Sequence, residues 1–167
     1  MNSRSKPYLT AMLGIAFVLI ASCAIPATSQ AYRLSGGGGK LGYTNPENLD
    51  GTMTVGGQLE FENQSRLHLV PNVSYWKVDR VSDVNPNVDV YYHFSSQNRT
   101  SPYLGGGLGL NMRNSEITDR SSTALNANLI GGIRFPGGEN HYFLEGRFTA
   151  SEMNQVALVG GITFHTH

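Results

Sequence analysis

The chain has 167 residues, which is enough for one domain, and its 12 basic and 12 acidic residues cancel. This balance gives no indication of the positive field that holds phosphates, so no nucleic acid is expected as a partner. The single cysteine excludes an intramolecular disulfide, whereas glycine is abundant, with 20 residues.

The first 31 residues are typical of a signal peptide. Arg4 and Lys6 supply a basic beginning, and residues 11–20 (AMLGIAFVLI) form an apolar core. That core is too short to cross a bilayer as a helix, which needs about 20 residues. Two processing sites fit the segment: small residues precede a cut before Tyr32, and residues 20–23 (IASC) resemble a lipobox in which Cys23 would be lipidated. The first is favoured, so we predict an exported protein with a cleaved signal peptide at 1–31 and a single barrel domain at 32–167.

Beyond residue 31 apolar and polar side chains alternate, which predicts β-strands with two unlike faces. Seven segments alternate clearly: 52–62, 67–76, 85–94, 104–113, 125–135, 141–150 and 155–165. An eighth, earlier strand is expected around 38–43, although the glycines before it could equally be a flexible lead-in. Polar connections separate the strands, at 44–51, 62–66, 77–83, 95–102, 113–122, 136–140 and 151–155. Eight antiparallel strands joined by short links can close into an up-and-down barrel.

The position of the aromatic residues suggests which face is outside. A soluble barrel turns its apolar face inward around a ligand, whereas a membrane barrel turns it outward against lipid. Here aromatic residues gather near the strand ends and aliphatic ones lie between, as two bilayer interfaces would select. One rim is expected to hold Tyr43, Tyr75, Trp76 and Phe148. The other is expected to hold Tyr103 and the interface aromatics Phe61, Tyr92, Phe94, Phe135, Tyr142 and Phe164.

The polar face carries charges of both signs, which would pair inside a narrow lumen. The lumen ion-pair candidates are Lys40, Glu60, Asp89, Arg113, Arg134, Glu145 and Arg147. Arg134 and Glu145 are expected to be neighbours, since they share the hairpin 124–150. Glycines at 105, 107 and 109 would leave room for long side chains such as Glu145 and Arg147. A permanent plug is favoured over a solute gate, because eight strands enclose little more than their own side chains.

Four segments carry a family resemblance: YLGGGLGLN (103–111), LIGGIRF (129–135), YFLEGRFTA (142–150) and VALVGGITF (156–164). From about Lys40 to Phe164 the chain resembles the small OmpA-like and OmpX-like outer membrane proteins of Gram-negative bacteria. The resemblance implies an all-β, eight-stranded antiparallel transmembrane β-barrel, integral to the cell outer membrane. We expect it to be a monomer. It also implies two partners, outer membrane lipid and the assembly machinery, which reads a last strand ending on an aromatic. Phe164 departs from that signal because three residues follow it.

Chemistry-bearing motifs are scarce. Residues 107–112 do not complete a dinucleotide-binding GxGxxG loop, since the third glycine and a following helix are missing. The histidines are expected at the periplasmic end, away from any serine at the outer rim: His68, His93, His141, His165 and His167. His165 and His167 share a face and could chelate a metal, but a polar tail is favoured. We therefore expect no catalytic residue, no cofactor and no metal.

Three hypotheses follow from the sequence. The first is a non-enzymatic outer membrane barrel with a structural or interaction role. The second is a narrow, porin-like solute channel of the same fold. The third is a soluble or lipid-tethered periplasmic barrel that binds an apolar ligand.

Overall fold

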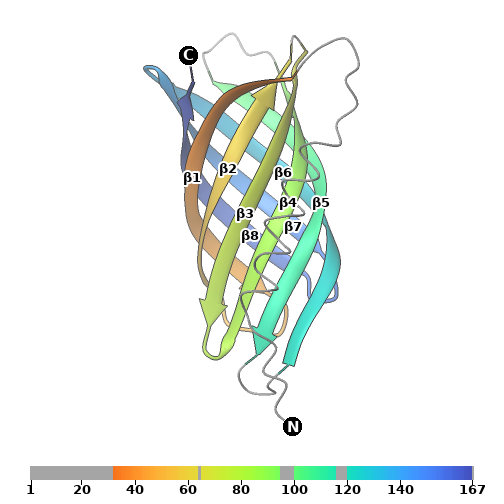
Figure 1. Ribbon diagram of the computed structural model, residues 1–167. Helices are drawn as coiled ribbons and strands as arrows, with labels where there is room; N and C mark the ends of the chain where they lie inside the picture. Colours follow the sequence, from red (N-terminus) through yellow and green to blue (C-terminus); the bar gives the residue numbers. More distant parts are fainter. Residues whose placement is uncertain (1–31, 64, 95–99, 116–119, 167) are drawn as a thin grey trace.

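The computed structural model describes residues 32–63, 65–94, 100–115 and 120–166 and is a closed antiparallel barrel (Figure 1). Its strands are β1 (Arg33–Pro46), β2 (Thr52–Glu62), β3 (Leu67–Val78), β4 (Val81–His93), β5 (Ser101–Ser115), β6 (Arg120–Gly137), β7 (Asn140–Ala150) and β8 (Gln155–His165). Each strand pairs with its neighbour in chain order, and β1 pairs with β8. The predicted all-β, eight-stranded up-and-down barrel is confirmed.

The signal peptide predicted at 1–31, with the Cys23 site, lies outside the described residues. Among the residues that are described, no helix is long and apolar enough to cross a membrane.

The two ends of the barrel differ in what they carry. The described chain starts and finishes at one end, where Gly36 of β1 pairs with His165 of β8. This end, called the terminal end below, lies at the top of Figure 1 and is also where β2, β4 and β6 end. The opposite end, called the far end, holds the short connections 47–51, 79–80 and 151–154.

Several strands are longer than the sequence predicted. The glycines at 36–39 are part of β1 rather than a flexible lead-in. The expected connection 77–83 is wrong: only Asp79 and Arg80 separate β3 from β4, and Asp79 makes the turn with φ 51°. Ser82 and Asp83 belong to β4. Asp83 is fully buried, since its side chain points into the polar lumen, and a polar residue there does not end a strand.

The alternation places apolar side chains outside and charged ones inside. Leu108 and Leu129 are 69% and 66% exposed, whereas Glu60, Asp89 and Glu145 are at most 1% exposed. This is the reverse of a soluble globular domain and the arrangement of a membrane barrel. One small apolar cluster interrupts the interior, formed by Val70, Tyr91, Tyr103 and Ile130. The interior is therefore not the apolar pocket that a soluble, ligand-binding barrel would need.

The aromatic residues divide between the outside and the lumen. Five of the interface candidates are exposed at or next to strand ends at the terminal end: Tyr92, Phe94, Phe135, Tyr142 and Phe164. The sixth, Phe61, is half-buried. At the far end Tyr43, Tyr75 and Phe148 are exposed. Trp76 and Tyr103 were expected at the rims, and this is wrong. Both occupy inward positions and are at most 3% exposed.

Candidate functional site

A central cluster of charged side chains crosses the lumen between β4 and β7. Arg147 lies with a terminal nitrogen 2.7 Å from Asp89 Oδ2 and 3.1 Å from Glu145 Oε1. The hydroxyls of Tyr91 and Tyr103 each donate to Glu145 Oε2 at 3.0 Å. Both carboxylates are buried and both oxygens of Glu145 have partners, so the carboxylate charges are paired within the cluster, whereas Arg147 Nη1 has no hydrogen-bond partner among the described residues.

Lys40 of β1 joins this cluster through an amide. Its Nζ donates to Asn72 Oδ1 at 2.9 Å, and Asn72 Nδ2 donates to Asp89 Oδ2 at 2.7 Å. An asparagine from β6 extends the network: Asn128 Nδ2 donates to Asn87 Oδ1 at 2.9 Å and its Oδ1 accepts from Thr149. Side chains from β1, β3, β4, β6 and β7 are thereby linked inside one lumen, which fixes opposite walls against each other.

Two smaller clusters lie on either side of the central one. At the terminal end, Glu60 Oε1 binds the guanidinium of Arg134 and lies 2.6 Å from His68 Nδ1. Toward the far end, Arg113 lies 3.2 Å from Asp83 Oδ2. The seven ion-pair candidates are thus distributed over three clusters along the lumen.

One expected pair is not formed. Arg134 faces Phe143 in the β6–β7 register, whereas Glu145 faces Gly132. Arg134 binds Glu60, from β2, and Glu145 is held by Arg147 and the two tyrosines. Asp89 instead pairs with Arg147 across the lumen.

Several lumen residues that contact the charges were not predicted from the sequence. His68, Asn72 and the tyrosine hydroxyls of Tyr91 and Tyr103 were not considered as partners. Asp83 was assigned to a connection. The alternation along the strand could have placed Asp83 correctly. It is an even number of residues from Asn85, Asn87 and Asp89, so its side chain points inward as theirs do.

The glycines of β5 make room for the neighbouring strand. A Cβ at Gly107 would overlap Asp89 Oδ1, and a Cβ at Gly109 would overlap Asn87 Oδ1. At Gly105 the obstacle is the ring of Tyr91. The expectation that these glycines make room for Glu145 and Arg147 therefore holds only indirectly. Gly107 and Gly105 leave space for Asp89 and Tyr91, which bind Arg147 and Glu145.

Replacing Gly107 by alanine should displace Asp89 from Arg147. We expect Gly107→Ala to lower the free energy of unfolding by about 1–3 kcal/mol, the usual cost of overpacking. Urea unfolding in lipid vesicles would measure it. The matched control is Gly57→Ala, where the added Cβ would lie 3.6 Å from its nearest neighbour, Gly38 O. Equal losses in the two variants would contradict the steric argument.

No family model and no curated protein matches the chain, but several solved structures do. The crystal structure of Neisserial surface protein A (NspA) has a TM-score of 0.70 at 12% identity, covering 81% of this chain and 99% of that one. The N-terminal β-barrel domain of Pseudomonas aeruginosa OprF has a TM-score of 0.62 at 18% identity, with coverage of 81% and 100%.

A third match is Ail, the attachment invasion locus protein of Yersinia pestis, with a TM-score of 0.53 at 11% identity and coverage of 80% and 100%. The chain has the fold of the small outer membrane β-barrels. Identities this low support the fold alone and say nothing of the chemistry of the lumen.

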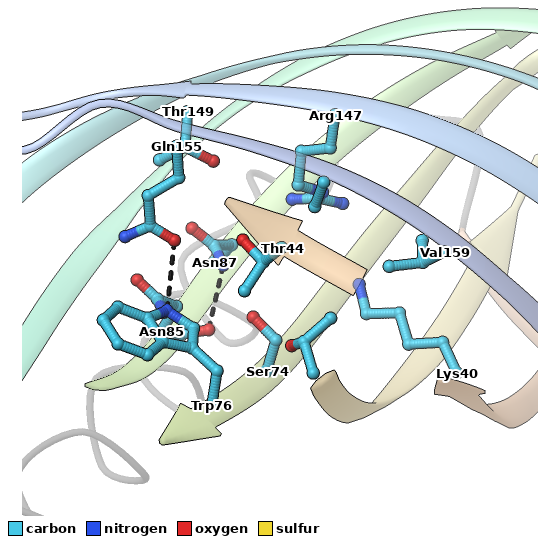
Figure 2. A pocket seen from close by; sticks show the side chains of 12 residues that line it. Lys40, Thr44, Ser74, Trp76, Asn85, Asn87, Arg147, Thr149, Gln155 and Val159 are labelled. Atoms are coloured by element: carbon cyan, nitrogen blue, oxygen red, sulfur yellow. Dashed lines mark hydrogen bonds between the residues drawn. The ribbon is translucent and has the colours of Figure 1, made fainter. Parts of the chain in front are cut away.

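Within this outer membrane barrel fold, a small cavity lies between the central cluster and the far end. Figure 2 shows it, with Lys40 and Arg147 on one side and Trp76 with Gln155 on the other. Trp76 Nε1 donates to Gln155 Oε1 at 3.1 Å and closes the wall. The space open to the centre of a water molecule is about 30 Å³. That volume holds roughly two waters, each of which needs about 10–15 Å³.

Proposed function

We propose that the protein is an integral outer membrane barrel with a structural or interaction role, closed by its own side chains and without catalysis. The observation that carries the proposal is the central cluster, in which Arg147, Asp89 and Glu145 are buried and mutually paired. A gate would have to separate these charges in a space of low dielectric, at a cost of several kcal/mol. A permanent plug needs no such step.

The proposal includes a location and partners. The apolar outer face suits outer membrane lipid, and the fold shared with NspA and the OprF domain supports the same membrane. The chain would be exported by its signal peptide, inserted by the outer membrane assembly machinery and remain a monomer. Ail is by its name an attachment protein, so an interaction role is compatible with this fold. No nucleic acid is involved.

Membrane fractionation with a gel-shift assay tests the location. A closed barrel resists detergent until heated, so unheated and heated samples should migrate differently, and the protein should pellet with outer membranes. A soluble protein without a heat-dependent shift would favour the periplasmic ligand-binding barrel and contradict the proposal.

Conductance in planar lipid bilayers separates the plug from the narrow channel. We expect no stepwise current from the purified wild-type barrel, because paired charges and Trp76 fill the lumen. A general porin reconstituted in the same bilayer serves as the positive control. Reproducible single-channel steps from the wild-type protein would overturn the plug and support the channel.

A further inference from the structure

Three potential metal ligands from neighbouring strands meet at the terminal end of the lumen. Glu60 lies on β2, His68 on β3 and His93 on β4. Each offers one ligand atom, and these atoms all lie within 4.8 Å of one another. The rings of His68 and His93 have centroids 4.3 Å apart. Two imidazoles and a carboxylate form a ligand set that zinc and related first-row metals accept.

Two of these groups carry buried atoms that no other described residue satisfies. Glu60 is 1% exposed and His93 is 8% exposed. Neither Glu60 Oε2 nor His93 Nε2 has a hydrogen-bond partner among the described residues. Native structures seldom leave such atoms unpaired without a reason. One oxygen and one nitrogen are therefore free for a ligand in the same small space.

The other ring nitrogen of His93 is occupied in a way that fits metal binding. Ser101 Oγ lies 3.5 Å from His93 Nδ1, and the ring of Tyr103 packs 5.1 Å from the His93 ring, centroid to centroid. Metal-binding histidines are commonly held by a second group at the nitrogen that does not bind the ion. This arrangement leaves Nε2 as the ligand atom.

We propose that Glu60, His68 and His93 form a binding site for a divalent first-row transition metal ion, with zinc as the ion to test. Zinc sits about 2.0–2.1 Å from nitrogen and oxygen ligands, so tetrahedral ligand atoms are about 3.3 Å apart. The ligand atoms, which now lie within 4.8 Å of one another, would have to adjust to that spacing when the ion binds. The fourth position would take water from the lumen.

Arg134 opposes the ion and provides a diagnostic variant. Its guanidinium binds Glu60 Oε1, and its side chain is 15% exposed. A cation at Oε2 of the same carboxylate is repelled by this charge. Arg134→Gln should therefore bind zinc about tenfold more tightly or better, provided that Glu60 is a ligand. Weaker or unchanged binding in this variant would overturn the assignment of Glu60.

A second histidine pair at the same end supplies the control. His141 and His165 have ring centroids 4.6 Å apart, and neither belongs to the three-residue cluster. His165 is exposed at the end of β8. His165→Gln removes one imidazole near the terminal end while leaving Glu60, His68 and His93 unchanged.

Calorimetric titration of tag-free protein folded in detergent micelles tests the site with zinc chloride. We expect one ion per chain, with a dissociation constant on the order of micromolar. His68→Gln and His93→Gln should each weaken binding by about tenfold or more, and His165→Gln should not change it. Absence of binding to wild type at millimolar zinc, or loss in His165→Gln but not in His93→Gln, would overturn the proposal.

A second measurement needs no variant and guards against misfolding. Zinc X-ray absorption of the loaded wild-type protein should show a nitrogen and oxygen shell with two imidazoles. A shell with one imidazole or none would overturn the site even if the variants failed to fold. Both measurements are made on the folded barrel in micelles, so their outcome is independent of whether the lumen conducts.

Discussion

Replacing Arg147 by methionine is expected to lower the free energy of unfolding of the barrel by about 3–5 kcal/mol, the cost of leaving buried charge unpaired. Arg147 is the cation that contacts both Asp89 and Glu145, and these carboxylates are at most 1% exposed. Methionine fills a similar volume, so the loss reflects charge rather than a large cavity. Tyr91 and Tyr103 would still donate to Glu145, but Asp89 would keep only amide partners.

Equilibrium unfolding in lipid vesicles, followed by the heat-dependent gel shift, measures this loss. The control is Arg33→Met, since Arg33 forms an ion pair with Glu62 while 82% of its side chain is exposed. An exposed pair contributes about 0–1 kcal/mol. Adding Asp89→Asn and Glu145→Gln to Arg147→Met should recover part of the stability, because no carboxylate is then left without Arg147 and Lys40 is the one buried charge that remains in the cluster. A loss in Arg147→Met no larger than in Arg33→Met would contradict the buried cluster.

Placing a charge on the outer face should distinguish a membrane barrel from a soluble one. Leu108 is 69% exposed and lies near the middle of β5. Leu108→Arg should cost about 2–4 kcal/mol in a bilayer, the range for arginine at the midplane of a barrel wall. On a water-exposed surface the same change would cost less than about 0.5 kcal/mol.

The matched substitution is Leu67→Arg, at the first residue of β3 near the terminal end. There the cost should fall to about 0–1 kcal/mol, as for charges near the interface. Both variants are compared in vesicles by urea unfolding. Equal and small losses at the two positions would contradict a lipid-facing β5.

The odd or even position of a residue along its strand predicted which way its side chain points better than its residue type did. The period of two correctly separated the inner and outer faces, because that separation follows from strand geometry alone. Errors arose where residue type was given priority over phase. Trp76 and Tyr103 were placed at the rims because they are aromatic and near strand ends, yet their parity points inward. Asp83 was placed in a connection because it is polar, yet its parity matches Asp89.

Contacts across the lumen could not be predicted from alternation. Which residues meet there depends on the stagger between strands and on how the barrel closes, and a strand pattern fixes neither. Arg134 was therefore assigned to Glu145, its neighbour along the hairpin, rather than to Glu60 from β2. The histidines were expected at one end, and His68 and His93 do meet there, but their contact with Glu60 required the closed barrel.

The seam between β1 and β8 has a consequence for folding kinetics. At Gly36, Gly38 and Gly42 a Cβ would overlap backbone carbonyl oxygens of β8, so the two strands lie close with few side chains between them. Every other strand pair is local in sequence, whereas this one joins the two extremes of the barrel. Closure must therefore wait for the last strand, and such non-local pairing is slow. Until then two unpaired edges remain open to other chains, and the rate of closing the seam sets how long the chain is prone to aggregate.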